Sequence, residues 1–509
     1  MQPNIISDIT QLIHESKIGF EKESIRVSDL KISQAPHPRS LGSALCNRFI
    51  TTDFSEAQLE MVTPPFRRVE HTIEFLDDIH HFVSNNIADE VIWPTSFPVS
   101  MIDESEIPIA NYGNSNLAKF KRLYRNGLSH RYGRLMQSIS GFHFNYSVSE
   151  RIWDEGILNE KGEDLISIRS SLYFNMIRNI YRYNWLIYYL FGASPILTSN
   201  FLKTSSAHFK KLDSETFYLP YATSLRMSHF GYQNTVRKKI GISLDSVEEY
   251  TSSLKAATST PCEEFQNIVG KSDKYEIQIN ENLLQIDDEF YAVARAKSRD
   301  TSNQSTSFKL SKSGVDFIEL RSLDLNPFNR VGIDQQTAFF LETFMAFCFL
   351  EQNEVLSPRE IGHIDHNDTL VTENGRKPNL KLHKNNKTVS LRSWGDEIMD
   401  ELFLIASLLD DDDKRYTNAV SEMKKRIFDS SLTLSERFLD EIRNQNISYP
   451  DFVKSLAVSN KDYYLNKKKS DNKNWHLLEE EAMKSDKIKE SMDSNLEESF
   501  EEYMDKIIR

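Results

Sequence analysis

The chain has 509 residues and a formal net charge of −14, from 61 Lys and Arg residues against 75 Asp and Glu residues. Its apolar fraction of 39% excludes a disordered chain, and its length allows one large domain or two to three modest ones. The acidic balance argues against a dedicated nucleic-acid binder, because most of the surface would repel a phosphate backbone, so a nucleotide would need local cations or a metal ion.

Two regions of different character follow one another along the chain. Between residue 18 and about residue 330, segments with period-two alternation of apolar and polar residues are interleaved with helical segments. Helical spacing dominates from Asp334 onward, and Asp334 is a predicted N-cap for the apolar helix that follows. We expect an α+β body over residues 1–333 with helical insertions, and a mainly helical part over residues 334–509 packed on that body.

Two later segments carry local signals without a specific function. Asn374-Gly375 indicates a hairpin turn between polar strands. After Lys467, Lys blocks alternate with acidic blocks around few apolar residues, which predicts exposed and partly frayed helices.

The cysteines and the apolar runs indicate in which cellular compartment the protein is expected. Cys46, Cys262 and Cys348 lie far apart, without the spacing of a zinc site or of a disulfide framework. The N-terminus lacks a secretion signal, and the apolar runs fall short of the roughly 20 residues that span a bilayer. We expect a cytoplasmic protein with neither a membrane nor a nucleic-acid partner.

The first informative segment is the predicted strand at 18–27. Its period of two places Glu21 and Glu23 on one face. Burying two unpaired carboxylates side by side is costly, so a positive group should lie near them if that face is buried. Taken alone, the segment fits a solvated polar strand face better.

The next carboxylates lie in the segment at 50–64. Asp53 follows two threonines at a predicted turn, Glu56 comes three residues later, and Glu60 lies inside an apolar run. A carboxylate with apolar neighbours on both sides is rarely buried without a partner.

Two further predicted strands carry polar groups on one face. In the segment at 142–148, His143 shares a face with Asn145 and Ser147, opposite an apolar face. In the segment at 315–323, Glu319 and Arg321 share a face, either as a plain salt bridge or as a metal ligand beside a guanidinium that binds oxyanions.

Together these segments offer five carboxylates and one imidazole: Glu21, Glu23, Asp53, Glu60, Glu319 and His143. A set made mostly of oxygen ligands suits Mg²⁺ or Mn²⁺ better than Zn²⁺, for which several nitrogen or sulfur ligands would be expected.

These segments, taken in order with several others, resemble the proteobacterial type of the glutamate–cysteine ligase family, also called gamma-glutamylcysteine synthetases. The resemblance runs from about residue 6 to beyond residue 350, and it is weaker through the C-terminal helices. The segments that carry it are Gly19-Phe-Glu-Lys-Glu-Ser-Ile-Arg26, His37-Pro38, Leu41-Gly-Ser-Ala-Leu45, Thr51-Thr-Asp-Phe-Ser-Glu56, Arg131-Tyr-Gly133, Met136-Gln-Ser-Ile-Ser-Gly-Phe-His143, Leu190-Phe-Gly-Ala-Ser-Pro195 and Ile318-Glu-Leu-Arg-Ser-Leu-Asp-Leu-Asn-Pro327.

The resemblance implies an ATP- and Mg²⁺-dependent ligase, with Mn²⁺ as a possible substitute metal. It would join the γ-carboxylate of L-glutamate to the amino group of L-cysteine through a γ-glutamyl phosphate, in the first step of glutathione biosynthesis. The implied fold is α+β: a glutamine synthetase-like, curved and mainly antiparallel sheet with flanking helices and a helical C-terminal part. No obligatory protein partner is apparent.

The resemblance also assigns residues. Glu23, Asp53 and Glu60 would hold one magnesium ion, and Glu21, His143 and Glu319 another near the ATP phosphates. Arg321 would contact the transferred phosphoryl group, acting in catalysis together with the ligand Glu319. The positions that match the family's cysteine pocket are Phe54, Tyr124, Leu128, Arg226 and Tyr232.

Arg295 and Lys297 would face the nucleotide, although Ala296 replaces the proline that the family usually has between them. Two other hypotheses remain open at this point. One is a glutamate ligase of the same fold that uses a different amine acceptor. The other is a non-catalytic relative that binds a metal or a nucleotide.

Overall fold

The computed structural model describes residues 12–99, 103–154, 164–202, 208–231, 240–268, 275–445, 447–495 and 498–508. Its centre is a sheet of eight strands in the order β10-β11-β6-β1-β4-β3, with β2 and β5 also paired to β1. All its pairings between described strands are antiparallel. The strands are β1 (Lys17–Ser28), β2 (Lys31–Ile32), β3 (Ile50–Thr52), β4 (Gln58–Val62), β5 (Val91–Ile92), β6 (Phe142–Ser147), β10 (Ala294–Lys297) and β11 (Phe317–Leu323).

The register of this sheet brings polar residues from separate segments onto one face. Glu21 of β1 lies opposite His143 of β6, and Glu23 lies opposite Glu60 of β4. Residues directly opposite each other in a ladder share a face, so these four side chains point the same way. The alternation of residues predicts a polar face within each strand. The register makes this face continuous across the neighbouring strands of the sheet.

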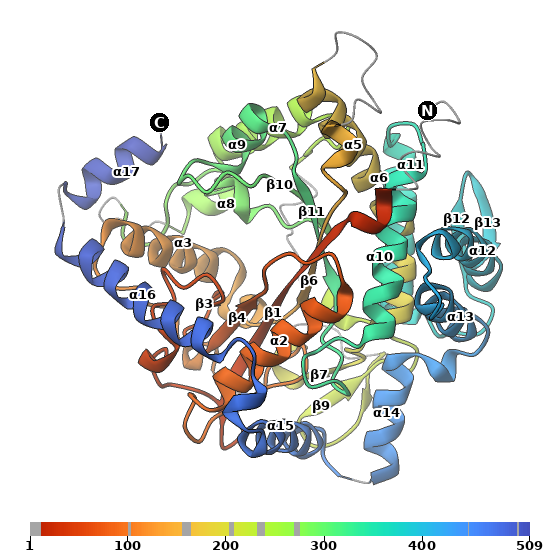
Figure 1. Ribbon diagram of the computed structural model, residues 1–509, viewed down its shortest axis with the longest axis horizontal. Coiled ribbons are helices and arrows are strands. Elements are labelled where there is room, and N and C mark those ends of the chain that lie inside the picture. Colours follow the sequence, from red (N-terminus) through yellow and green to blue (C-terminus); the bar gives the residue numbers. More distant parts are fainter. Residues whose placement is uncertain are drawn as a thin grey trace.

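The other face of the sheet forms the main hydrophobic core. Phe20, Phe142 and Phe144 are fully buried there, as the alternation in 142–148 predicts. Helix α2 (Val69–Ser84) packs on β1 and β4, α6 (Leu165–Phe191) packs on β10 and β11, and α10 (Gln335–Leu350) packs against both helices. In Figure 1, α2 lies in front of the central strands, and α10 stands to their right. Asp334 caps α10 as predicted, since its carboxylate accepts from the backbone N–H of Thr337 at 2.7 Å.

Shorter elements surround this layer. They are α3 (Asn116–Tyr132), α4 (Arg134–Gln137), α5 (Arg151–Asp154), α7 (Val247–Ser259), α8 (Glu263–Gln266), α9 (Thr306–Ser313) and a small sheet of β7 (Ile196–Thr198), β8 (Lys210–Lys211) and β9 (Thr216–Tyr218). The C-terminal part contains α11 (Pro358–Asn374), α12 (Leu391–Leu409), α13 (Arg415–Phe428), α14 (Leu434–Gln445), α15 (Tyr449–Asn466), α16 (Trp475–Ser494) and α17 (Phe500–Ile508). Helices and an antiparallel sheet together give an α+β fold. The division at residue 333 stays a prediction.

The hairpin predicted at Asn374-Gly375 is wrong. Asn374 ends α11, and the following Gly375 keeps a helical backbone. The hairpin lies later, between β12 (Lys381–Lys384) and β13 (Lys387–Ser390), and Asn385 and Asn386 turn the chain with φ of +44° and +63°. Two consecutive residues with positive φ are what a tight hairpin turn requires, and asparagine tolerates that conformation.

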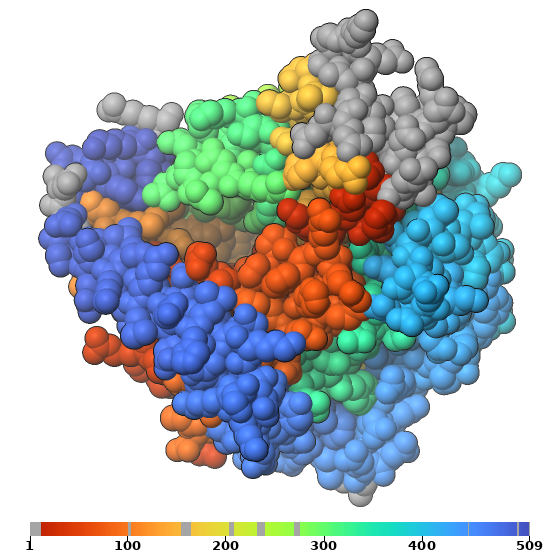
Figure 2. Space-filling model, viewed as in Figure 1, coloured from red at the N-terminus to blue at the C-terminus, as the bar shows by residue number. Residues whose placement is uncertain are grey.

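The helices after Lys467 include α16, which packs on the N-terminal part of the chain. Figure 2 shows the C-terminal segment lying against elements from the N-terminal part. Glu481 of α16 accepts two hydrogen bonds from the Arg48 guanidinium, at 2.9 and 2.8 Å. Gly42 approaches α16 so closely that an added Cβ would lie 2.6 Å from the Ala482 Cα. These contacts fix α16 on the N-terminal loop. None of the described helices is both long enough and apolar enough to cross a membrane.

Candidate active site

A cavity of about 370 Å³ lies on the polar face of the sheet. The sheet forms one wall, and α3 with the segment 286–291 forms the other. Twelve of the fourteen residues predicted from the sequence line it: Glu21, Glu23, Asp53, Phe54, Glu60, Tyr124, Leu128, His143, Arg295, Lys297, Glu319 and Arg321. Residues from five strands and one helix thus converge on a single cavity.

His143 lies at the centre of the carboxylates. Its Nδ1 is 3.2 Å from both Glu21 and Glu319, and its Nε2 is 3.3 Å from Glu23. Burial and the nearby Arg321 disfavour the charged imidazolium, but the carboxylates outweigh them and raise the pKa of His143 to about 9. The protonated imidazole therefore balances part of the negative charge of the surrounding carboxylates.

Glu319 connects the carboxylates to two cations. Its side chain forms ion pairs with Lys297, at 2.9 Å, and with Arg321. Burial opposes ionisation of Glu319, but Lys297 and Arg321 hold its pKa well below the usual value. Glu319 and Glu21 in turn raise the pKa of Lys297 against the effect of burial. This end of the cavity holds fixed charges of both signs.

The other end of the cavity, around Glu60, is acidic. Within the described residues, the Glu60 carboxylate makes no hydrogen bond and no ion pair. Burial raises the pKa of Glu60 to about 8, and the charges of Glu21, Asp53 and Glu23 add to the effect. Burial also raises the pKa of Glu23. Carboxylates crowded in this way are expected to bind a cation.

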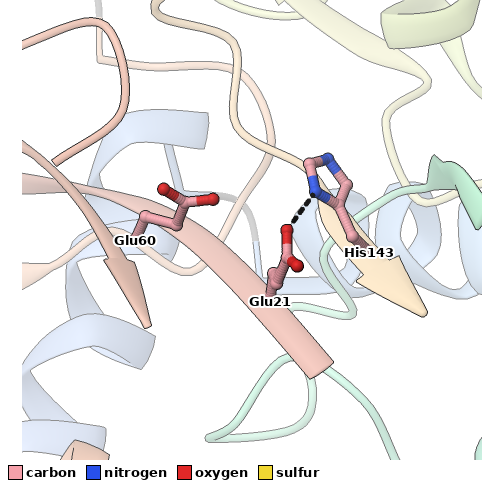
Figure 3. A group of neighbouring side chains, drawn as sticks. All are labelled: Glu21, Glu60 and His143. Carbon is pink, nitrogen blue, oxygen red and sulfur yellow. Dashed lines mark hydrogen bonds and ion pairs between the residues drawn. The ribbon is translucent and has the colours of Figure 1, made fainter. Parts of the chain in front are cut away.

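One set of ligand atoms is already close together. Oxygens of Glu21 and Glu60 and a ring nitrogen of His143 all lie within 4.8 Å of one another. Figure 3 shows these three side chains, with Glu21 and His143 pointing toward each other. Glu60 belongs to one of the two predicted magnesium sites, and Glu21 and His143 belong to the other. A mainly oxygen ligand set fits a magnesium or manganese ion.

Only some of the residues predicted for the cysteine pocket line the cavity. Phe54, Tyr124 and Leu128 line the cavity. Arg226 does not line it, because its guanidinium is buried and donates to the carbonyls of Arg321 and Leu323, at 3.1 and 3.2 Å. Tyr232 lies outside the described residues.

The predicted nucleotide residues lie on the edge strand β10. Arg295 donates to the carbonyls of Asp288 and Phe290, at 3.0 and 2.7 Å, and Lys297 pairs with Glu319. Arg295 lies opposite Glu319 in the ladder, which places the two cations at the same end of the cavity. Ala296, where the family usually has proline, is an ordinary strand residue here.

Sequence reasoning missed several residues of the cavity wall, above all Lys121 and Arg125 of α3. Burial and the neighbouring Arg125 lower the pKa of Lys121 to about 8. A usable signal exists, because residues 121, 124, 125 and 128 fall on one face of a helix at spacings of three and four. Tyr291 of the opposite wall was also missed, and no local pattern marks it.

Arg131 ties the helical wall to the rest of the cavity. Its guanidinium, fully buried, pairs with Glu289 at 3.0 Å and donates to the carbonyl of Asn280 at 2.6 Å. The hydroxyl of Tyr132 donates to the same Glu289, at 2.7 Å. Arg131 therefore holds the wall in place without lining the cavity, whereas its neighbour Tyr132 lines it.

The sequence is similar to known ligases over nearly its whole length. The sequence model of a family described as glutamate-cysteine ligase matches residues 5–371. A glutamate–cysteine ligase of Alcanivorax borkumensis is 38% identical over 504 residues, covering 96% of this chain and 94% of the relative. One from Shewanella amazonensis is 40% identical over 451 residues, covering 88% and 86%.

Solved structures agree with these relatives. The crystal structure of a glutamate–cysteine ligase from Francisella tularensis, in complex with AMP, superimposes with a TM-score of 0.90 at 31% identity, covering 97% of both chains. A bifunctional glutathione synthetase from Pasteurella multocida gives a TM-score of 0.70 at 25% identity, covering 91% of this chain and 54% of that one.

Proposed function

This chain belongs to the glutamate–cysteine ligase family, and from that premise we propose how its cavity carries out the reaction. The enzyme joins the γ-carboxylate of L-glutamate to the amino group of L-cysteine at the expense of ATP, the first step of glutathione biosynthesis. The observation that carries the residue assignments is the polarity of the cavity, acidic around Glu60 and balanced by Lys297 and Arg321 around Glu319.

We assign the balanced end to the phosphates of ATP. A carboxylate is a poor acylating agent because oxide is a poor leaving group, so ATP first converts it into a γ-glutamyl phosphate. Arg321 presents a planar guanidinium that suits the transferred phosphoryl group, and Lys297 and Arg295 supply further positive charge. The AMP in the Francisella tularensis structure supports nucleotide binding by this fold.

We assign the carboxylates to magnesium, or to manganese in its place. Glu23, Asp53 and Glu60 would hold one ion, while Glu21, His143 and Glu319 would hold another. When bound, the metal ions offset the charge of the phosphate oxygens during in-line transfer. The crowded carboxylates support this assignment, because they repel one another and Glu60 has no described protein partner.

We place the cysteine side chain against Phe54, Tyr124 and Leu128. They line the cavity together with Asp53 and form part of its apolar surface. A small thiol suits such a surface. We assign no protein partner and place the reaction in the cytoplasm, as the sequence predicts.

The test is an ADP-release assay with the purified protein, glutamate, ATP and magnesium. We expect ADP to appear only when cysteine is also present, and to stop when a chelator removes the metal ion. A panel of other amines in place of cysteine tests the acceptor. Equal ADP release without cysteine, a better rate with another amine, or no release under any condition would overturn the proposal.

A further inference from the structure

Strand β11 carries a bulge at the residue proposed to contact the phosphoryl group. Leu320 lies opposite Phe144 and Leu323 lies opposite Phe142, so β11 takes three steps where β6 takes two. Arg321 lies within this irregular stretch. A bulge removes residues from the ladder and re-aims a side chain, which is why bulges occur beside active sites. The direction of Arg321 therefore depends on whatever holds the bulge.

The buried guanidinium of Arg226 holds it. One Nη donates to the carbonyl of Arg321 at 3.1 Å, and the other donates to the carbonyl of Leu323 at 3.2 Å. Only 2% of Arg226 is exposed. The planar guanidinium can reach two carbonyls at once, which a single ammonium group does less well.

The same guanidinium touches the backbone that orients Glu23. An added Cβ on Gly141 would lie 2.0 Å from an Nη atom of Arg226, so only glycine leaves room for this side chain. The Gly141 N–H donates to the Glu23 carboxylate at 2.7 Å, and the Gly141 carbonyl accepts from the Glu23 N–H at 3.1 Å. Arg226 thus contacts both the strand that carries Arg321 and the Gly141 loop that binds Glu23.

Asp324 in turn holds Arg226. Its carboxylate lies 3.8 Å from the Arg226 guanidinium. It also accepts from the hydroxyls of Ser194 and Ser224, at 2.6 and 2.9 Å, which belong to two different loops. The Ser194 hydroxyl accepts from the Arg226 N–H at 3.2 Å. A buried guanidinium needs such a partner, because an unpaired buried charge is strongly destabilising.

We propose that Asp324 and Arg226 form a positioning clamp that fixes the β11 bulge and the Gly141 loop, and so sets the positions of Arg321 and Glu23. Arg226 then acts through these residues. The inference rests on the proposed roles of Arg321 and Glu23. A displacement of about 1 Å at a reacting group can cost on the order of 100-fold in rate, so loosening the clamp should be visible in kcat.

The experiment compares Arg226→Lys and Asp324→Asn with wild type. Arg178→Lys is the matched control, because Arg178 is also buried and donates to two backbone carbonyls, those of Leu244 and Asp245, away from the cavity. We expect both clamp variants to lose about 10- to 100-fold in kcat and to need more magnesium for half-saturation. The KM for cysteine should stay within about twofold of wild type, since neither Arg226 nor Asp324 lines the cavity.

Gly141→Ala provides a second route if Arg226→Lys does not fold. It should lower kcat in the same way. In the Arg226→Ala background the loss of kcat should be much smaller, because the guanidinium that would clash with the added Cβ is absent. Gly362→Ala is its control, because nothing lies within 4 Å of the added Cβ there. Far-UV circular dichroism and the unfolding midpoint establish that each variant is folded.

Two results would overturn the clamp alone: wild-type kcat in the folded clamp variants, or a rise in the KM for cysteine that accounts for the whole loss of kcat/KM. The first is decisive when Glu23→Gln and Arg321→Lys are inactive in the same assay. If those two variants keep wild-type activity, the proposed site fails and the clamp with it.

Discussion

The Glu319 carboxylate lies 2.9 Å from the Lys297 ammonium, on the neighbouring strand of the sheet. The same carboxylate pairs with Arg321 and lies 3.2 Å from His143. One buried side chain therefore joins the cations to the carboxylates, and its charge is central to the electrostatics of the cavity.

Replacing Glu319 by glutamine should abolish turnover without unfolding the protein. The change removes a negative charge at nearly constant volume, so it should weaken metal binding and leave Lys297 and Arg321 without their common partner. We expect kcat to fall about 100-fold or more, by analogy with the removal of other electrostatic groups from active sites. Steady-state ADP release measures it. Glu401→Gln, on the exposed side of α12, should change nothing, and wild-type turnover in Glu319→Gln would contradict the metal assignment.

Lys121 should contribute to the binding of an anionic substrate. It lines the cavity from α3, and its Nζ lies 5.4 Å from the centre of the Tyr112 ring. Losing a hydrogen bond to a charged group costs about 1.5–3 kcal/mol, so Lys121→Met should raise the KM of glutamate, cysteine or ATP by about 10-fold or more. The control is Arg122→Met, since Arg122 is the exposed neighbour on the same helix. Three unchanged KM values would remove Lys121 from the site.

The sequence predicts which residues share one face of a strand. It does not predict which residues of the neighbouring strands lie opposite them. Glu21 and Glu23 share a face because alternate strand residues must. That Glu23 lies opposite Glu60 follows from the register of β1 and β4, which no local pattern specifies. Lys121 was missed for the same reason, because its neighbour Glu60 is distant in the chain and only the folded protein brings them together.

Turn signals were less reliable than strand periodicity. Asn374-Gly375 has the composition of a hairpin turn, yet packing continues α11 to Asn374. The actual turn uses Asn385 and Asn386, where glycine would be expected. Arg226 shows a further limit, because no local pattern in its motif indicates that its guanidinium donates to the carbonyls of Arg321 and Leu323.

Glu342 should make stability fall as pH rises. It is buried in α10, where it accepts from the Tyr416 hydroxyl at 2.8 Å, and burial raises its pKa to about 8 from the ordinary 4.5. Between these two values the folded protein keeps a proton that the unfolded chain loses. Stability from this group is therefore fully present below about pH 4.5 and is lost progressively up to about pH 8.

Urea unfolding of wild type and Glu342→Gln at pH 5, 7 and 9 tests this dependence. The neutral amide does not titrate, so the variant should gain on wild type with rising pH, at most by about 1.4 kcal/mol per pH unit within the window. Glu422→Gln on the exposed face of α13 should follow wild type at every pH. Parallel pH profiles for wild type and Glu342→Gln would show that Glu342 is ionised in the folded protein.

Gly42→Ala should loosen α16. Gly42 has φ of +77°, a conformation that favours glycine, and an added Cβ would lie 2.6 Å from both the Cα and the carbonyl oxygen of Ala482. Backbone atoms cannot swing aside as a side chain does, so α16 would have to move. We expect a loss of about 1–3 kcal/mol in the free energy of unfolding, as for other overpacked sites. Hydrogen exchange should show reduced protection along Trp475–Ser494.

Gly362→Ala should be neutral or slightly stabilising, because alanine is favoured over glycine within a helix. An unchanged unfolding midpoint and unchanged protection of α16 in Gly42→Ala would mean that this contact does not hold the helix on the N-terminal loop.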